Sequence, residues 1–266
     1  MEITQLVGYF LAILVGISLG LIGSGGSILT VPILVYIMAV EPVLATAYSL
    51  FIVGSTALVG GVKNAFLKLV DFKTVIVFGI PSIISVYVAR AFIVPKIPDV
   101  VFTLNSFILT KSVALMLLFA IIMILAAFSM IRPNKNQEIN SVIKYNYGLI
   151  LLEGTLVGVL TGLVGAGGGF LIIPALVLLA KMPMKLAVGT SLFIIAAKSL
   201  LGFIGDLQGS EIINWKLVLT FTSLSILGIF IGIALSKKIN GSKLKTSFGY
   251  FVLIMGIYII FKELFK

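Results

Sequence analysis

Ten apolar segments, separated by more polar breaks, make up most of the chain. About 20 apolar residues are needed for a helix to cross the hydrocarbon core of a bilayer, and most of the segments have that length. Two are shorter, and at 1.5 Å per residue their helices would fall well short of a core of about 30 Å. The segments are 3–22, 27–40, 43–62, 72–94, 108–131, 145–164, 169–180, 184–205, 214–236 and 244–262, with 27–40 and 169–180 the short ones.

The second half of the chain repeats a pattern from the first. From Gly20–Ile52 to Gly162–Ile194 the register holds without a gap, and 15 of 33 positions are identical. A period near half the chain length indicates two copies of one unit rather than a solenoid. The sequence therefore predicts a first transmembrane repeat, 1–131, a polar linker, 132–144, and a second transmembrane repeat, 145–266.

Composition supports a membrane protein. The chain is 60% hydrophobic and only 11% charged, whereas a soluble domain has about 25% charged residues. The net charge of +10 comes from basic residues that flank apolar spans, which favours topology signals and lipid headgroup contact over nucleic-acid binding. The absence of Cys and His excludes disulfides, thiolate chemistry and most transition-metal sites. We expect an all-α polytopic membrane protein with no metal and no cofactor.

The basic residues also distinguish two topologies. If all ten segments cross the bilayer, 12 Lys and Arg residues lie on one side of the membrane and 6 on the other. If the two short segments are re-entrant and only eight segments cross, the division is 9 and 9. The asymmetric division is the expected one. It predicts five segments per repeat, four long and one short after a Gly-rich break. With an odd number of crossings per repeat, the second repeat is inverted relative to the first. We expect the protein in a prokaryotic cell membrane with both termini on the side away from the cytoplasm.

The repeated glycine breaks are the main candidate site. Interrupted apolar segments at corresponding positions of two halves indicate a transporter's binding site, and the free N–H groups at the start of the following helix attract anions. Close helix packing is the alternative interpretation. Because proline suits a first helical turn, the short helices are expected to start near Pro32 and Pro174, with 25–30 and 167–172 extended. The predicted substrate contacts are Gly23, Ser24, Gly25, Gly26 and Ser27 in the first break and Gly165, Gly167, Gly168 and Gly169 in the second.

Polar residues within the long segments extend the candidate site. Ser49 and Ser191 occupy equivalent positions, and either bond their own helix at i−4 or, with Thr190, donate to a polar substrate. Lys198 lies seven residues after Ser191 on the same helix face, where a charge either faces a cavity or reaches the interface. Glu153 is a coupling candidate that would pair with Lys198, carry protons or reach the interface. Asp206 and Glu211 are expected in an outer loop.

The motifs resemble those of the sulfite exporter TauE/SafE family of membrane permeases. The resemblance rests on the paired Gly-x-x-Gly-x-Gly-Gly-x-x-x-x-x-Pro segments, on Thr190-Ser191-Leu192-Phe193 and on Asn214-Trp215-Lys216, with Asp71-Phe72-Lys73 as its first-repeat counterpart. It implies about eight transmembrane helices and export of sulfur-containing anions such as sulfite or sulfonates. The first repeat departs from the family pattern at Ser24 and Ser27 and at Ala47-Tyr48, which replaces Gly-Thr.

Together these features and the resemblance predict a secondary transporter that exports a small anion, a sulfur oxyanion such as sulfite or an organosulfonate, by alternating access of the two repeats. A passive anion channel and a membrane scaffold are the alternatives. An enzyme is disfavoured because the chain has no His, no Cys and no paired intramembrane carboxylates. The expected partners are the anion, the lipid bilayer and, as an open possibility, further copies of the chain.

Overall fold

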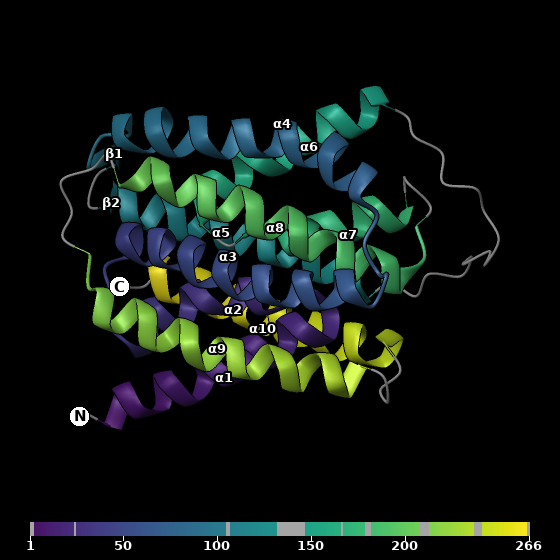
Figure 1. Ribbon diagram of the computed structural model, residues 1–266. Coiled ribbons are helices and arrows are strands. Elements are labelled where there is room, and N and C mark those ends of the chain that lie inside the picture. Colours follow the sequence, from purple (N-terminus) through teal and green to yellow (C-terminus); the bar gives the residue numbers. More distant parts are fainter. Residues whose placement is uncertain are drawn as a thin grey trace.

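The protein is a bundle of long, roughly parallel and antiparallel helices (Figure 1). The computed structural model describes residues 3–23, 25–104, 107–131, 147–165, 167–178, 182–207, 213–236 and 241–264. The α-helices in these ranges are α1 (Ile3–Ile22), α2 (Gly25–Pro32), α3 (Pro42–Phe66), α4 (Phe72–Val88), α5 (Lys111–Ile131), α6 (Tyr147–Val164), α7 (Gly169–Leu178), α8 (Met184–Asp206), α9 (Trp215–Ser236) and α10 (Gly241–Leu264). The predicted linker, 132–144, lies outside the described residues.

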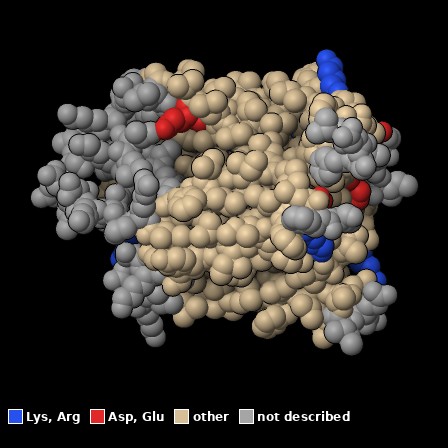
Figure 2. Space-filling model, turned by 180° about the vertical axis from the view of Figure 1, so that it is seen from behind, with Lys and Arg blue, Asp and Glu red and all other residues tan. Residues whose placement is uncertain are grey.

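Length and composition make the chain a multi-pass membrane protein. Within the described residues, six helical segments are long and apolar enough to cross a membrane, and Gly26–Ile37 and Leu151–Val164 are shorter apolar helices. Figure 2 shows a broad area without charged side chains between the two ends of the molecule, where the coloured Lys, Arg, Asp and Glu lie. The start of α1 and the end of α10 lie at the same end of the bundle (Figure 1).

The observed helices correct two details of the prediction. The short helices begin at Gly25 and Gly169, not near the prolines, so most of 25–30 and 167–172 is helical rather than extended. Pro32 ends α2, and a π-helical turn, Ile33–Ile37, continues the helix beyond it. A π turn is one way for a helix to adapt to the N–H that proline lacks. The glycine breaks therefore reverse the chain within a few residues.

The second correction is a β-hairpin between α4 and α5, which the all-α prediction lacked. Helix α4 continues through a π-helical turn, Ala89–Ile93, and a 3₁₀ turn, Val94–Lys96. Strand β1 (Val100–Leu104) then pairs antiparallel with β2 (Phe107–Thr110). Residues 108–110 thus belong to a strand, although we expected them in a helix. The hairpin lies at the same end of the bundle as the start of α1 (Figure 1).

Two helix pairs pack backbone against backbone through glycine. In α1, a Cβ added at Gly20 would lie 2.8 Å from the backbone nitrogen of Ile233 in α9, and one added at Gly16 would lie 2.9 Å from that of Ile229. In α6, a Cβ at Gly158 would lie 2.7 Å from Ser85 Cβ in α4. Small residues four apart are typical of such close crossings in membranes. Each pair joins one helix from each predicted repeat.

Two further pairs run antiparallel. Gly54 of α3 faces Leu200 of α8, whereas Gly61, farther along α3, faces Phe193, earlier in α8. Helices α5 and α10 pack in the same sense, since Gly249 faces Ile131 and Gly256 faces Ile124. The helices of the two halves therefore interleave, with α3 and α8 among the most buried spans at the centre.

Matching hydroxyl groups fix the starts of α4 and α9. The backbone N–H of Asp71, the N-cap of α4, donates to Thr190 Oγ1 at 2.9 Å, and the backbone N–H of Asn214 donates to the Tyr48 hydroxyl at 2.6 Å. Tyr48 and Thr190 are equivalent positions of the repeat. Tyr48 departs from the family pattern, but its hydroxyl accepts a backbone N–H at a helix start just as that of Thr190 does.

Candidate functional site

The two glycine breaks depend on left-handed backbone. Gly23 has φ of 75°, and in the second break Gly165, Gly167 and Gly168 have φ of 71°, 65° and 58°. Residues with a Cβ rarely adopt this region. These glycines end α1 and α6 and turn the chain back into the short helices α2 and α7. Ser24 lies outside the described residues, so its predicted contact stays a prediction.

The two breaks meet between the central helices. A Cβ added at Gly167 would lie 2.7 Å from Val53 Cγ1 in α3, 3.2 Å from Ser27 Cβ and 3.5 Å from Ile195 Cγ2 in α8. Val53 and Ile195 are equivalent positions of the repeat, and Ser27 belongs to the first break and is fully buried. The structure thus brings predicted residues of both breaks together, at the level of α3 and α8 where Ser49 and Ser191 are one turn away.

Lys198 lies beside the second break, and its side chain is fully buried. Its Nζ donates to Thr161 Oγ1 of α6 at 3.0 Å, and a Cβ added at Gly168 would lie 2.7 Å from that Nζ. Within the described residues the one ion pair is elsewhere, so no carboxylate compensates Lys198. A buried ammonium with a neutral partner is costly, which makes Lys198 a candidate for a functional site. The alternative, in which the Lys198 side chain extends to the membrane interface, does not agree with this buried position.

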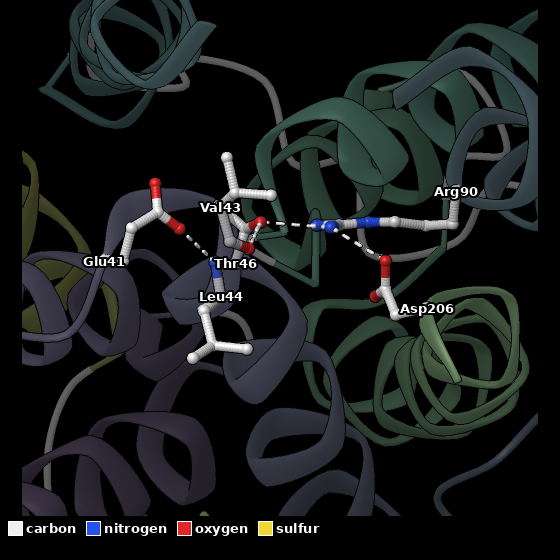
Figure 3. A network of polar contacts seen from close by, with 6 residues as sticks. All are labelled: Glu41, Val43, Leu44, Thr46, Arg90 and Asp206. Atoms are coloured by element: carbon white, nitrogen blue, oxygen red, sulfur yellow. Dashed lines mark hydrogen bonds and ion pairs between the residues drawn. The ribbon is translucent and has the colours of Figure 1, made fainter. Parts of the chain in front are cut away.

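A second buried cation was missed by sequence reasoning. Arg90, in the π-helical turn after α4, is 1% exposed. Its Nη1 donates to Thr46 Oγ1 at 3.0 Å and lies 3.3 Å from Asp206 Oδ1 (Figure 3). A Cβ added at Gly165 would lie 2.6 Å from Arg90 Nη2. Asp206 therefore ends α8 and pairs with a buried guanidinium rather than lying in an outer loop; Glu211 is outside the described residues.

The predicted hydroxyl groups have different surroundings. Ser49 Oγ is buried without a hydrogen-bond partner among the described residues, so it does not bond its own helix at i−4. Ser191 Oγ donates to Val188 O at 2.8 Å and lies 3.4 Å from Gly23 O. Thr190 accepts the Asp71 N–H, as described above. Of the three predicted hydroxyl groups, that of Ser49 is thus the one left to form a hydrogen bond with a ligand.

The remaining predicted residues occupy α2, α6 and α7. Glu153 is half-buried in α6, two helical turns before Thr161, and within the described residues it forms no ion pair with Lys198. Gly25 and Gly26 form the first turn of α2, Gly169 begins α7, and Pro174 lies inside α7. No group of three or more Asp and Glu residues in the described ranges is arranged to hold a metal ion.

The two breaks differ in charge although they share the same spacing of glycines. At the first break, Cβ atoms added to Gly23 and Gly26 would meet Val188 Cγ1 at 2.8 Å and Leu19 Cγ at 2.8 Å. At the second break the corresponding neighbours are Arg90 and Lys198. Among the described residues, buried positive charge therefore gathers on the second break alone.

Buried cations beside interrupted helices in a multi-pass helical membrane protein are features that membrane transporters share. The chain belongs to the sulfite exporter TauE/SafE family, whose model matches residues 9–259. It is thus a membrane permease by family.

Curated relatives carry the same general description. The chain is 27% identical to a "Probable membrane transporter protein" of Xylella fastidiosa strain Temecula1, over 94% of this chain and 92% of that protein. It is 28% identical to "Probable membrane transporter protein YunE" of Bacillus subtilis, over 96% and 97%. It is also 28% identical to "Probable membrane transporter protein MJ0441" of Methanocaldococcus jannaschii, over 94% of each. No solved structure matches the chain.

Proposed function

We propose that the protein is a secondary transporter that exports a small anion, a sulfur oxyanion such as sulfite or an organosulfonate, from a prokaryotic cell. The observation that carries the proposal is the buried Lys198 ammonium at the second glycine break, hydrogen-bonded to the neutral Thr161. The family name, sulfite exporter, supports the substrate class.

Electrostatics favours an anion at this position. An isolated charge at the centre of a bilayer costs about 3 kcal/mol on insertion scales, and an anion held against Lys198 would offset that cost. The Ser49 hydroxyl, which has no hydrogen-bond partner in the described part of the chain, and the backbone N–H groups of the glycine breaks would supply further donors. Ser27, Gly167 and Gly168 would line the same position, because their lack of bulk lets a ligand approach the backbone.

Alternating access would use the repeat. We propose that the two repeats have inverted topology, because α3 and α8, which are equivalent in sequence, pack antiparallel, as do α5 and α10. The other close pairs obey the same symmetry. Helix α1 packs on α9, and their equivalents in the other repeat, α6 and α4, also pack on each other. Movement of one set of pairs against the other would open the central position to each side in turn. Glu153 remains our candidate for coupling this movement to protons.

The test is flux of radiolabelled sulfite into proteoliposomes that contain the purified full chain. Lys198→Met removes the charge at similar length, and we expect it to lower saturable flux by at least about tenfold, the equivalent of 1.4 kcal/mol. Lys216→Met changes an exposed lysine near the start of α9 and is the matched control, with flux expected to stay near that of the native chain.

Two results would contradict the proposal. Native flux no greater than that of protein-free vesicles would argue against transport of this anion. Equal saturable flux in the native and Lys198→Met chains would remove Lys198 from the site. Stimulation of uptake by unlabelled sulfite on the far side of the membrane is expected for alternating access and not for a passive channel.

A further inference from the structure

The ion pair between Arg90 and Asp206 is incomplete. A guanidinium and a carboxylate usually form two parallel hydrogen bonds, but here Nη1 alone reaches Oδ1, at 3.3 Å. Within the described residues, Arg90 Nε, Arg90 Nη2 and Asp206 Oδ2 are buried and have no hydrogen-bond partner. An Arg side chain that is fully buried thus leaves two of its three nitrogens unsatisfied, which is costly unless another acceptor binds them.

The two partners differ in their access to water. The Arg90 side chain is 0% exposed, whereas that of Asp206 is 15% exposed. Of the two side chains only that of Asp206 is in part accessible, at the end of the bundle where α3 begins and α8 ends. Figure 3 shows Arg90 directed between Thr46 and Asp206, with Glu41 farther along at the start of α3. This is also the end at which α1 starts and which we expect outside the cytoplasm, so an exported anion would reach Arg90 and Asp206 after the central position.

We propose that Arg90 is a second oxyanion-binding subsite, and that Asp206 is an internal anion which the incoming oxyanion displaces. The proposal deepens the proposed function and rests on it for the direction of the path. The planar fork of donors selects an oxyanion over a halide, because several oxygens can accept from Nε and the Nη atoms at once. Thr46 holds the guanidinium from the opposite side, accepting from Nη1 and donating to Val43 O at 2.6 Å.

The subsite is continuous with the proposed central position. Gly165 abuts Arg90 Nη2 at one end of the second break, and Gly168 abuts Lys198 Nζ at the other. An oxyanion that leaves Lys198 for the outside would thus reach Arg90 along the backbone of 165–168. When it leaves, Asp206 again pairs with Arg90, so the guanidinium is never left without an anion.

The test is equilibrium binding of radiolabelled sulfate to the purified full chain in detergent, at constant ionic strength set with sodium chloride. All variants carry Lys198→Met, so that the proposed central position does not contribute. In this background Asp206→Asn removes the competing charge, and we expect the half-saturating sulfate concentration to fall at least about threefold. Replacing the pair by neutral groups, with Arg90→Gln and Asp206→Asn together, should abolish saturable binding without leaving an unpaired buried charge.

Glu41→Gln is the matched control, since it removes a carboxylate from the same end of α3 that does not contact Arg90. It should leave the half-saturating concentration unchanged. Equal sulfate affinity with and without Asp206→Asn, or saturable binding that survives the double substitution, would overturn the subsite. The result is separable from the transport test: an unaltered flux in Lys198→Met would refute the central position alone, and an unaltered affinity in Asp206→Asn would refute the subsite alone.

Discussion

Single glycines decide where positive charge can lie in this molecule. At Gly165 and Gly168 the missing Cβ leaves the room that Arg90 and Lys198 occupy, and both glycines have a positive φ. The neighbouring side chains at the equivalent glycines of the first break, Gly23 and Gly26, are Val188, Ser191 and Leu19, and none of them is charged. Two constraints, backbone conformation and space, thus coincide at the residues that contact the cations.

Gly168→Ala should destabilise the protein for both reasons. A left-handed backbone costs about 1–2 kcal/mol for a residue with a Cβ, and the added methyl group would meet Thr161 Oγ1 and Lys198 Nζ. We expect the melting temperature of the detergent-solubilised protein, followed by fluorescence of Trp215, to fall by several degrees.

Gly79→Ala is the control for that substitution. Gly79 lies inside α4, and apart from the backbone of its own helix no described heavy atom lies within 4 Å of an added Cβ, so alanine should be neutral or stabilise the helix by about 0.5–1 kcal/mol. An equal fall in melting temperature for both variants would show that the strain at Gly168 is not as described.

At the scale of elements, the apolar pattern was sufficient to predict the helices. The expected segment 184–205 corresponds to Met184–Asp206, and 214–236 to Trp215–Ser236. The hairpin was missed because its β-branched and aromatic residues merge with the apolar run of α5. Lys198 was found because it interrupts an apolar run. Arg90 lies near the end of its segment, where a basic residue is expected at the interface, and only tertiary packing buries it.

The contacts of Tyr48 and Thr190 predict that both residues stabilise the start of a helix. Tyr48→Phe and Thr190→Val each remove the acceptor for one backbone N–H at the start of a helix, which typically costs about 1 kcal/mol. We expect similar losses in denaturant or thermal stability for the two variants. If Thr190 also contacts substrate, Thr190→Val will in addition raise the KM for sulfite flux, whereas Tyr48→Phe will not.

At the scale of the whole molecule, the pairs of helices relate the two halves in a regular way. Lys73 and Lys216 are exposed residues in the first turns of α4 and α9, which the hydroxyl groups of Thr190 and Tyr48 fix in the same manner. In a parallel duplication these helix starts would lie on the same side of the membrane. In an inverted one they lie on opposite sides.

Cysteine labelling in intact cells distinguishes the two, because the native chain has no Cys. With Lys73→Cys and Lys216→Cys in separate chains, we expect a membrane-impermeant maleimide to label Lys216→Cys from outside and Lys73→Cys only after permeabilisation. The direction follows from the excess of basic residues, which places the start of α4 on the cytoplasmic side. Labelling of both positions from the same side would contradict inverted repeats, and the mechanism of alternating access proposed from them would then need another source of symmetry.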